Sequence, residues 1–139
     1  MSGDIVLEPI GVVRSPLTDP AQAPRQGFLG APEATIELEE RVLDGLTGIA
    51  PGQEIVVLTW LDRAARDVLR THPRDERSEP ERGVFSTRSP ARPNPIGLHR
   101  VPVLEVDGAR LVVGDLEAID GTPVLDIKPV LHGPREDGA

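Results

Sequence analysis

The stretch VPVLEVDGARLVVG, from Val101 to Gly114, is the clearest structural signal in the chain. Two valine-rich segments flank Asp107-Gly108, and an Asp-Gly dipeptide between such segments is typical of a tight β-hairpin. The alternation of apolar and polar residues is imperfect in Val101–Val106. Apolar side chains on both faces are typical of a sheet that closes on itself or is covered by a dimer partner. The stretch therefore predicts two paired strands inside a larger β-structure.

Short strands are also predicted on both sides of this hairpin. The segment Glu54–Leu61 (EIVVLTWL) is rich in β-branched residues and follows Pro51-Gly52, which is the pattern of a strand after a turn. Strands at hairpin spacing with little helix predict an all-β to β-rich fold, a small barrel of short, mostly antiparallel strands that occupies residues 1–139 as one domain. The other predicted elements are strands over Asp4–Val13 (broken near Pro9), Ala34–Leu38, Gly83–Thr87 and Thr122–Ile127, one or two helical turns over Glu39–Leu46, a short helix or bulged strand over Asp62–Arg70, and a surface loop over Thr71–Arg82.

The composition excludes several classes of protein. The 139 residues include no cysteine, which excludes a disulfide framework, a thiolate metal site and a cysteine nucleophile. The only aromatic residues are Phe28, Trp60 and Phe85, so the core must consist of valine, leucine and isoleucine. No apolar segment is long enough to span a membrane, and the N-terminus does not resemble a signal peptide. We therefore expect a soluble cytoplasmic protein without a membrane partner.

The charge is distributed unevenly. The chain has a formal net charge of −8, which argues against an ordinary nucleic-acid binder. Residues 63–100, however, hold nine of the 15 basic residues and only five of the 23 acidic residues, and all nine are arginine. This segment predicts either a cationic face that binds a phosphate or carboxylate, or a solvated surface with its own salt bridges.

Several common catalytic motifs are absent from the sequence. No GxGxxG follows a strand, no Walker A motif occurs, and no GxSxG surrounds a serine. The three histidines, His72, His99 and His132, are far apart and lack partners at metal-binding spacing, so no metal is expected. On its predicted strand, His99 is interpreted as a surface or core histidine rather than a catalytic one.

One segment combines cationic side chains with a stiff backbone. In TRSPARPNPIGL (Thr87–Leu98), three prolines hold Arg88, Arg92 and Asn94 in a loop of restricted geometry. The residues alone leave open whether this is a binding loop or a rigid turn that caps a barrel end.

A second segment places a carboxylate inside an apolar strand. In DGTPVLDIKP (Asp120–Pro129), Asp126 points opposite to its apolar neighbours and shares its face with Lys128. The residues alone leave open whether the two form only an ion pair or take part in chemistry.

These two segments resemble the signature of the TrmO family, also called the TsaA-like or YaeB-like family. The matching strings are GVFSTRSPARPNPIGL and DGTPVLDIKP, and IGVVRSP (Ile10–Pro16) and PRQG (Pro24–Gly27) match upstream in the same order. The resemblance covers about Ile5 to Leu131. It implies an S-adenosylmethionine-dependent methyltransferase on a small β-barrel, which forms a homodimer and N6-methylates the threonylcarbamoyladenosine beside the anticodon of tRNA.

The resemblance also implies which residues form the site. Arg88 is expected to pair with the carboxylate of the cofactor, and backbone groups near Gly114–Glu117 are expected to hold its adenine and ribose. The implied cofactor contacts are Pro24, Arg25, Gln26, Leu61, Asp62, Arg88, Leu98, Gly114, Asp115, Leu116 and Glu117.

The catalytic roles are hypotheses built on this resemblance. An amide-like nitrogen is a poor nucleophile and benefits from a nearby base, for which Asp126 is the candidate. Asn94 is expected to orient the substrate, and Arg92 and Lys128 are expected to contact it.

Some features depart from the family pattern. The central strand, usually aromatic and containing histidine, is IAPGQEIVVLTWL here, and the tyrosine of DIKPY is Val130. The additional C-terminal domain of typical bacterial members is not expected in a chain that ends at Ala139. Two alternatives therefore remain beside the tRNA methyltransferase: a methyltransferase with a small-molecule or other acceptor, and a non-enzymatic module that binds S-adenosylmethionine.

Overall fold

The computed structural model describes residues 3–19, 21, 23–24, 30–73 and 77–131 of the chain. The elements in chain order are β1 (Gly11–Arg14), β2 (Ala34–Leu38), the 3₁₀-helix η3 (Glu40–Leu46), β3 (Glu54–Trp60), β4 (Arg70–Thr71), β5 (Arg82–Gly83), the 3₁₀-helix η5 (Val84–Ser86), β6 (Ile96–Asp107), β7 (Arg110–Val113) and β8 (Pro123–Pro129).

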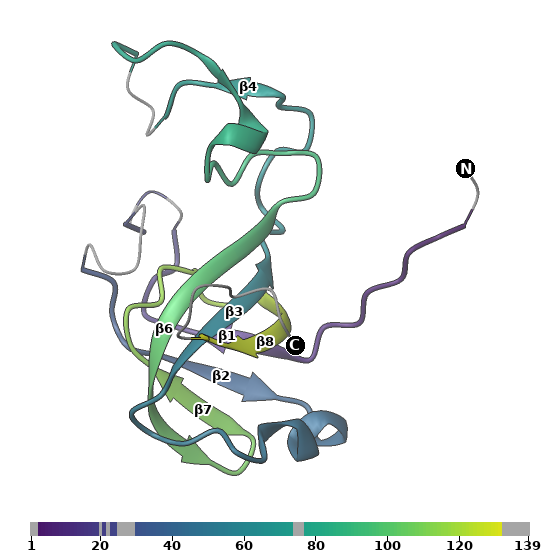
Figure 1. Cartoon of the computed structure of the whole chain (residues 1–139), viewed down its shortest axis with the longest axis vertical. Helices are drawn as coiled ribbons and strands as arrows, with labels where there is room; N and C mark the ends of the chain where they lie inside the picture. The colour runs from purple at the N-terminus through teal and green to yellow at the C-terminus, as the bar shows by residue number, and fades with distance from the viewer. Residues whose placement is uncertain (1–2, 20, 22, 25–29, 74–76, 132–139) are drawn as a thin grey trace.

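The six longer strands form a closed barrel (Figure 1). The order around the barrel is β1-β2-β7-β6-β3-β8, and β8 returns to β1 through the pairs Gly11–Val124 and Val12–Pro123. All of these pairs are antiparallel. Closure leaves no long edge strand without a partner, which removes the usual route to edge-to-edge association. The predicted antiparallel β-barrel is therefore confirmed.

Alternate residues of the barrel strands point inward and form an aliphatic core. On β3, Ile55, Val57 and Thr59 are buried, whereas the residues between them are partly exposed. This period of two is the pattern of a strand with one face in a core. The buried core consists of Val13, Ala34, Ile36, Leu38, Ile55, Val57, Val101, Val103, Leu111, Val113, Leu116, Ala118 and Val124.

The predicted hairpin is formed by β6 and β7, but its turn lies one residue beyond the predicted Asp107-Gly108 dipeptide. Asp107 still pairs with Arg110, so the two turn residues are Gly108 and Ala109. Gly108 has φ 57°, in the left-handed region that the first residue of such a turn requires. Between Val103 and Glu105 the register shifts by one residue, which is a β-bulge. The bulge explains the imperfect alternation in the sequence, because the extra residue, Leu104, is exposed on the outside of the barrel.

The first strand is shorter than predicted. Only its last part forms β1, and Ile5, Val6 and Leu7 are exposed and outside any strand. Pro9 has no N–H to donate to a neighbouring strand, and the N–H of Ile10 makes the first hydrogen bond to β8. The predicted break near Pro9 therefore marks where the barrel begins.

Two predictions for the region between β3 and β6 are wrong. The expected strand Gly83–Thr87 is instead the end of β5 followed by η5. Gly83 is the last residue of β5 that pairs with β4, so the residues after Gly83 have no strand partner in this sheet. The expected helix or bulged strand over Asp62–Arg70 is a series of turns. The carbonyl of Ala65 accepts a hydrogen bond from Arg92 of the proline-rich loop, so the backbone of this segment pairs with that loop.

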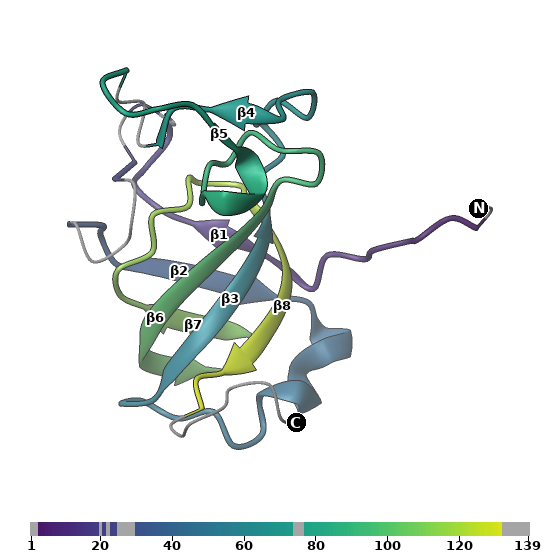
Figure 2. The ribbon, with the colours of Figure 1, turned by 45° about the horizontal axis from the view of Figure 1, so that its top comes forward.

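The two ends of the barrel differ. The small β4–β5 sheet, η5 and the proline-rich loop lie together at one end, whereas η3 lies at the other (Figure 2). We call the former the loop end. No helix in the described ranges has the length and apolarity to cross a membrane. Within the same ranges, no cluster of three or more His, Asp or Glu side chains is arranged to hold a metal ion.

Candidate functional site

The proline loop (Arg88–Pro95) is held in shape by its own arginine. Arg92 donates from Nη1 to the carbonyl oxygens of Thr87 and Ser89, both at 3.0 Å. Its backbone N–H donates to the carbonyl of Ala65 at 3.1 Å. Arg92 therefore stabilises the fold of the loop, and its role as a substrate contact stays a prediction.

A second arginine, which the sequence analysis missed, fixes the other end of this loop. Arg66 donates from Nε to the carbonyl of Pro93 at 2.8 Å and from Nη2 to Oδ1 of Asn94 at 3.1 Å. Its guanidinium carbon lies 5.1 Å from the centre of the Trp60 ring, in cation–π geometry. Arg66 thus orients the Asn94 amide. The signal that could have revealed this role in the sequence was the position of Arg66 in a short arginine-rich segment that follows the tryptophan.

Arg88 stands apart from this network. Its side chain is exposed, and no hydrogen bond or ion pair joins it to another described residue. A guanidinium without an internal partner is available to an anionic ligand. Of the predicted PRQ contacts, Pro24 is half-buried, whereas Arg25 and Gln26 lie outside the described residues.

The loop Gly114–Ile119, between β7 and β8, has an unusual backbone. Asp115 has φ 53°, the only positive φ at a non-glycine position in the described chain. Leu116 is 0% exposed and Ala118 is 3% exposed, so both residues belong to the core and neither offers its backbone to a ligand. Asp115, Glu117 and Ile119 are at least partly exposed, and none of their backbone N–H groups donates to another described residue. These three N–H groups are available to water or a ligand.

The loop end of the barrel interior is closed by a buried chain of polar side chains. His99 on β6 is 4% exposed and Thr59 on β3 is fully buried. Nε2 of His99 lies 2.7 Å from Oγ1 of Thr59, and Nδ1 lies 2.6 Å from Oε1 of Glu117. His99 is therefore a core histidine, as interpreted from sequence, but its contact with a predicted cofactor residue was missed.

Asp126 and Leu98 lie on the same outer face of the barrel. Leu58 of β3 is paired with both residues: with Leu98 of β6 on one side and with Asp126 of β8 on the other. Asp126 accepts a hydrogen bond from the N–H of Ile127 at 2.8 Å and forms a 3.7 Å ion pair with Lys128. The predicted shared face of Asp126 and Lys128 is confirmed, and the barrel also brings Asp126 two strands from Leu98.

The end of β3 lies against the proline loop. The N–H of Leu61 donates to the carbonyl of Pro95 at 2.8 Å, and the N–H of Asp62 donates to the carbonyl of Trp60. The side chain of Asp62 is exposed. These two predicted cofactor contacts therefore adjoin the loop that carries Arg88.

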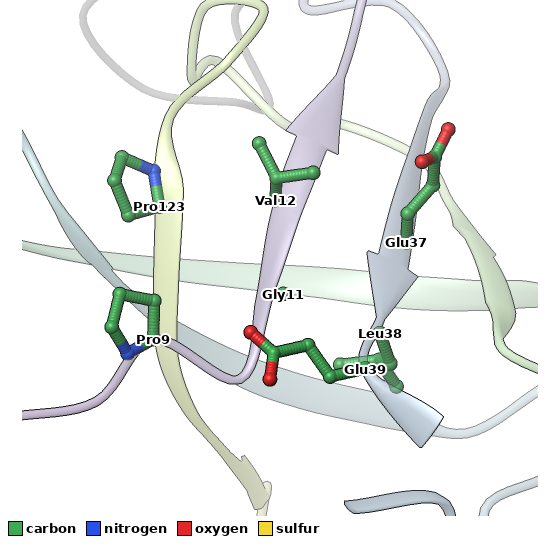
Figure 3. A pocket seen from close by; sticks show the side chains of 7 residues that line it. All are labelled: Pro9, Gly11, Val12, Glu37, Leu38, Glu39 and Pro123. Carbon is green, nitrogen blue, oxygen red and sulfur yellow. The ribbon is translucent and has the colours of Figure 1, made fainter. Parts of the chain in front are cut away.

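Two hollows of the described surface lie elsewhere. One lies along β1, with Pro9 and Pro123 on one side of the strand and Glu37 on the other (Figure 3). Its carboxylates, Glu37 and Glu39, are 3.6 Å and 2.8 Å from arginine side chains, so it offers no uncommitted charge. The other lies on the β4–β5 sheet. Neither contains a predicted site residue.

Comparison with known proteins decides the family. Residues 12–134 match the model of the tRNA-methyltransferase O N-terminal domain. The chain belongs to the TrmO family. An S-adenosyl-L-methionine-binding protein of Archaeoglobus fulgidus is 50% identical over 89% of this chain and 88% of its own length. A probable S-adenosyl-L-methionine-binding protein of Methanothermobacter thermautotrophicus is 48% identical over 91% of this chain and 90% of its own.

Solved TrmO structures share the barrel. The crystal structure of TrmO from Pseudomonas aeruginosa superposes with a TM-score of 0.72 at 30% identity, over 99% of this chain. A second TrmO structure superposes with a TM-score of 0.74 at 31% identity. The chain spans 62% of each of these TrmO chains. The family match includes both the proline loop and the Gly114–Ile119 loop, which places this protein in a methyltransferase family with relatives named for binding S-adenosylmethionine.

Proposed function

We propose that this protein is an S-adenosylmethionine-dependent methyltransferase whose cofactor binds at the loop end of the barrel. The observation that carries the proposal is the Gly114–Ile119 loop, in which the unpaired backbone N–H groups of Asp115, Glu117 and Ile119 accompany the carboxylate of Glu117. Backbone groups of this kind suit the polar edge of an adenine, and the exposed Arg88 suits a carboxylate. The residues present therefore fit the groups that S-adenosylmethionine carries.

The residues of this chain have separate tasks in the proposed reaction. When bound, S-adenosylmethionine supplies a methyl group that a nucleophile displaces from sulfur. Asn94, oriented by Arg66, holds the acceptor in line, because direct displacement depends mainly on positioning. Asp126 would accept the proton that the acceptor nitrogen loses when it takes up the methyl group. Lys128 stabilises the Asp126 carboxylate before that transfer.

The proposed acceptor is the N6 nitrogen of threonylcarbamoyladenosine in tRNA. The family model is named for tRNA methylation, and residues 63–100 carry nine arginines. Within that segment Phe85 is 79% exposed, and an exposed aromatic ring among cations is typical of sites that stack unpaired bases. This combination supports an RNA acceptor and offers a stacking surface in place of the tyrosine that Val130 replaces.

A second candidate is a methyltransferase with a small-molecule acceptor. The net charge of −8 favours it, because an acidic body repels the phosphate backbone of an RNA outside the cationic segment. The two candidates share the cofactor site and differ only in the acceptor. The third possibility, a module that binds the cofactor without transferring methyl groups, predicts binding and no turnover.

The proposed assembly is a homodimer of single-barrel chains in the cytoplasm. Ile96 and Leu98 on the outer face of β6 are 44% and 46% exposed, and Leu104 on the same strand is 43% exposed. A row of exposed apolar side chains on one strand suits a contact between two copies. Because Leu98 is a predicted cofactor contact, this arrangement puts the cofactor next to the proposed dimer interface.

Calorimetric titration with S-adenosylmethionine tests the cofactor site. Wild type is expected to bind, and Arg88→Ala is expected to bind roughly 10-fold to 100-fold more weakly, the value of one charge-assisted hydrogen bond. Arg110→Ala, an exposed arginine on the β6–β7 hairpin, is the matched control and is expected to bind like wild type. Methyl transfer to tRNA, followed by nucleoside mass spectrometry, then separates the acceptors. Absence of binding by wild type would refute the proposal.

A further inference from the structure

Hydrogen bonds between the side chains of Thr59, His99 and Glu117 join three parts of the barrel that are remote in sequence. Thr59 lies 40 residues before His99, and Glu117 lies 18 residues after it. A carboxylate oxygen accepts, so Nδ1 of His99 donates to Oε1 of Glu117. Through Nε2 the same ring shares a hydrogen bond with the hydroxyl of Thr59. The three side chains form a continuous series of hydrogen bonds that ends on the Glu117 carboxylate.

Gly97 indicates that space for this series is built into the barrel. It lies opposite Thr59 on β6, where a glycine weakens a strand. A Cβ at this position would collide with Oγ1 of Thr59 and would lie 2.7 Å from Nε2 of His99. A glycine inside a strand marks a close approach, and here it makes room for the two side chains.

The second carboxylate oxygen of Glu117 is left for a ligand. No described hydrogen bond engages Oε2, and no buried side-chain nitrogen or oxygen in the described residues lacks a partner. Oε2 is therefore reachable from solvent, consistent with the 16% exposure of the Glu117 side chain. His99 holds one oxygen inside the barrel mouth and leaves the other facing out, in the loop that carries the unpaired backbone N–H groups of Asp115 and Ile119.

We propose that His99 is a positioning residue that holds Glu117 so that Oε2 accepts hydrogen bonds from the vicinal hydroxyls of a ribose. This inference rests on the proposed function, since the ribose belongs to the cofactor. A carboxylate is an acceptor only, so it matches a pair of hydroxyl donors, and a carboxylate whose orientation is already fixed loses less entropy on binding.

The test compares two amides at position 99. The amide nitrogen of asparagine can occupy the place of Nδ1 and donate to Glu117, whereas that of glutamine reaches the place of Nε2 near Thr59. His99→Asn is therefore expected to keep the affinity for S-adenosylhomocysteine within about threefold of wild type, and His99→Gln is expected to lose roughly tenfold or more. Glu117→Gln is expected to weaken the binding of S-adenosylhomocysteine by a similar factor. The double variant, His99→Gln with Glu117→Gln, is expected to bind no more weakly than the weaker of the two single variants.

The readout that separates positioning from general stability is discrimination between ligands. Wild type and His99→Asn are expected to bind S-adenosylhomocysteine more tightly than its 2′,3′-dideoxy analogue, and His99→Gln is expected to lose this preference. Thermal unfolding of each variant checks that it is folded. Thr59→Val, which replaces the hydroxyl with a methyl group of similar size, is used instead of His99→Gln if the latter does not fold. Equal preference in all folded variants would overturn this inference alone. Absence of binding by wild type would overturn it together with the proposed function.

Discussion

Replacing Gly97 with alanine is expected to destabilise the barrel, although a glycine-to-alanine change in a strand usually stabilises. The new Cβ would collide with Oγ1 of Thr59 and would lie 2.7 Å from Nε2 and 3.2 Å from Cε1 of His99. Both side chains are buried and hydrogen-bonded to each other, and His99 is also bonded to Glu117. They cannot move aside without breaking this series of hydrogen bonds.

The expected size of the effect follows from three contributions. Lower entropy of the unfolded chain stabilises the variant by about 0.5–1 kcal/mol. Overpacking destabilises it by about 1–3 kcal/mol, and loss of the buried hydrogen bond between Thr59 and His99 by about 1 kcal/mol. The free energy of unfolding is therefore expected to fall by about 1–3 kcal/mol, which lowers the Tm of a chain of this size by roughly 4–12 °C.

Urea unfolding and calorimetry measure this change. Gly45→Ala is the control, because Gly45 lies in η3 and its added Cβ would meet no atom within 4 Å. This control is expected to raise the free energy of unfolding by about 0.5–1 kcal/mol, which is the entropic contribution without the collision. Adding Thr59→Ala to Gly97→Ala removes the colliding oxygen and is expected to cost less than the sum of the single changes. An unfolding free energy for Gly97→Ala equal to or above that of wild type would refute the reasoning.

Three further predictions concern the reaction and the assembly. Arg66→Ala is expected to lower methyl transfer several-fold and to affect it more than cofactor affinity, because Arg66 bonds Pro93 and Asn94 directly and Arg88 only through the loop. Arg66→Lys is expected to resemble alanine, because a lysine lacks the two-donor geometry, and rescue by lysine in single-turnover assays would show that charge alone matters. Asp126→Asn is expected to reduce turnover by roughly 100-fold or more with unchanged calorimetric binding, and unchanged turnover would remove Asp126 from the mechanism. Ile96→Lys is expected to convert the homodimer into monomers in sedimentation experiments, and a wild type that is monomeric throughout would contradict the proposed assembly.

The sequence predicted the barrel strands well where the pattern was local. Ala34–Leu38 was predicted with its observed bounds, and the hairpin was predicted correctly, with its turn one residue later, at Gly108-Ala109. These elements follow from β-branched residues and turn dipeptides, which act over a few residues. The prediction for Gly83–Thr87 was wrong because its apolar content is strand-like, whereas only a neighbouring strand would have made it one.

The candidate site was predicted only in part, and the omissions share a cause. Arg88 and Asn94 could be proposed from the sequence because their motif is contiguous. Arg66 was missed because it reaches Asn94 from a segment 28 residues upstream. The link between His99 and Glu117 was also missed, although Gly97 on the same face of β6 was a signal of close approach.

By itself, the sequence determined the stiffness of the proline loop, the turn of the hairpin and the inward face of each strand. These depend on covalent geometry and on alternation along a single segment. Only the tertiary structure decided that Thr59 and His99 meet and that Glu117 closes the barrel above them. Such contacts depend on strand register and barrel closure, which are set by the packing of all six strands together and by a bulge that shifts the pairing by one residue.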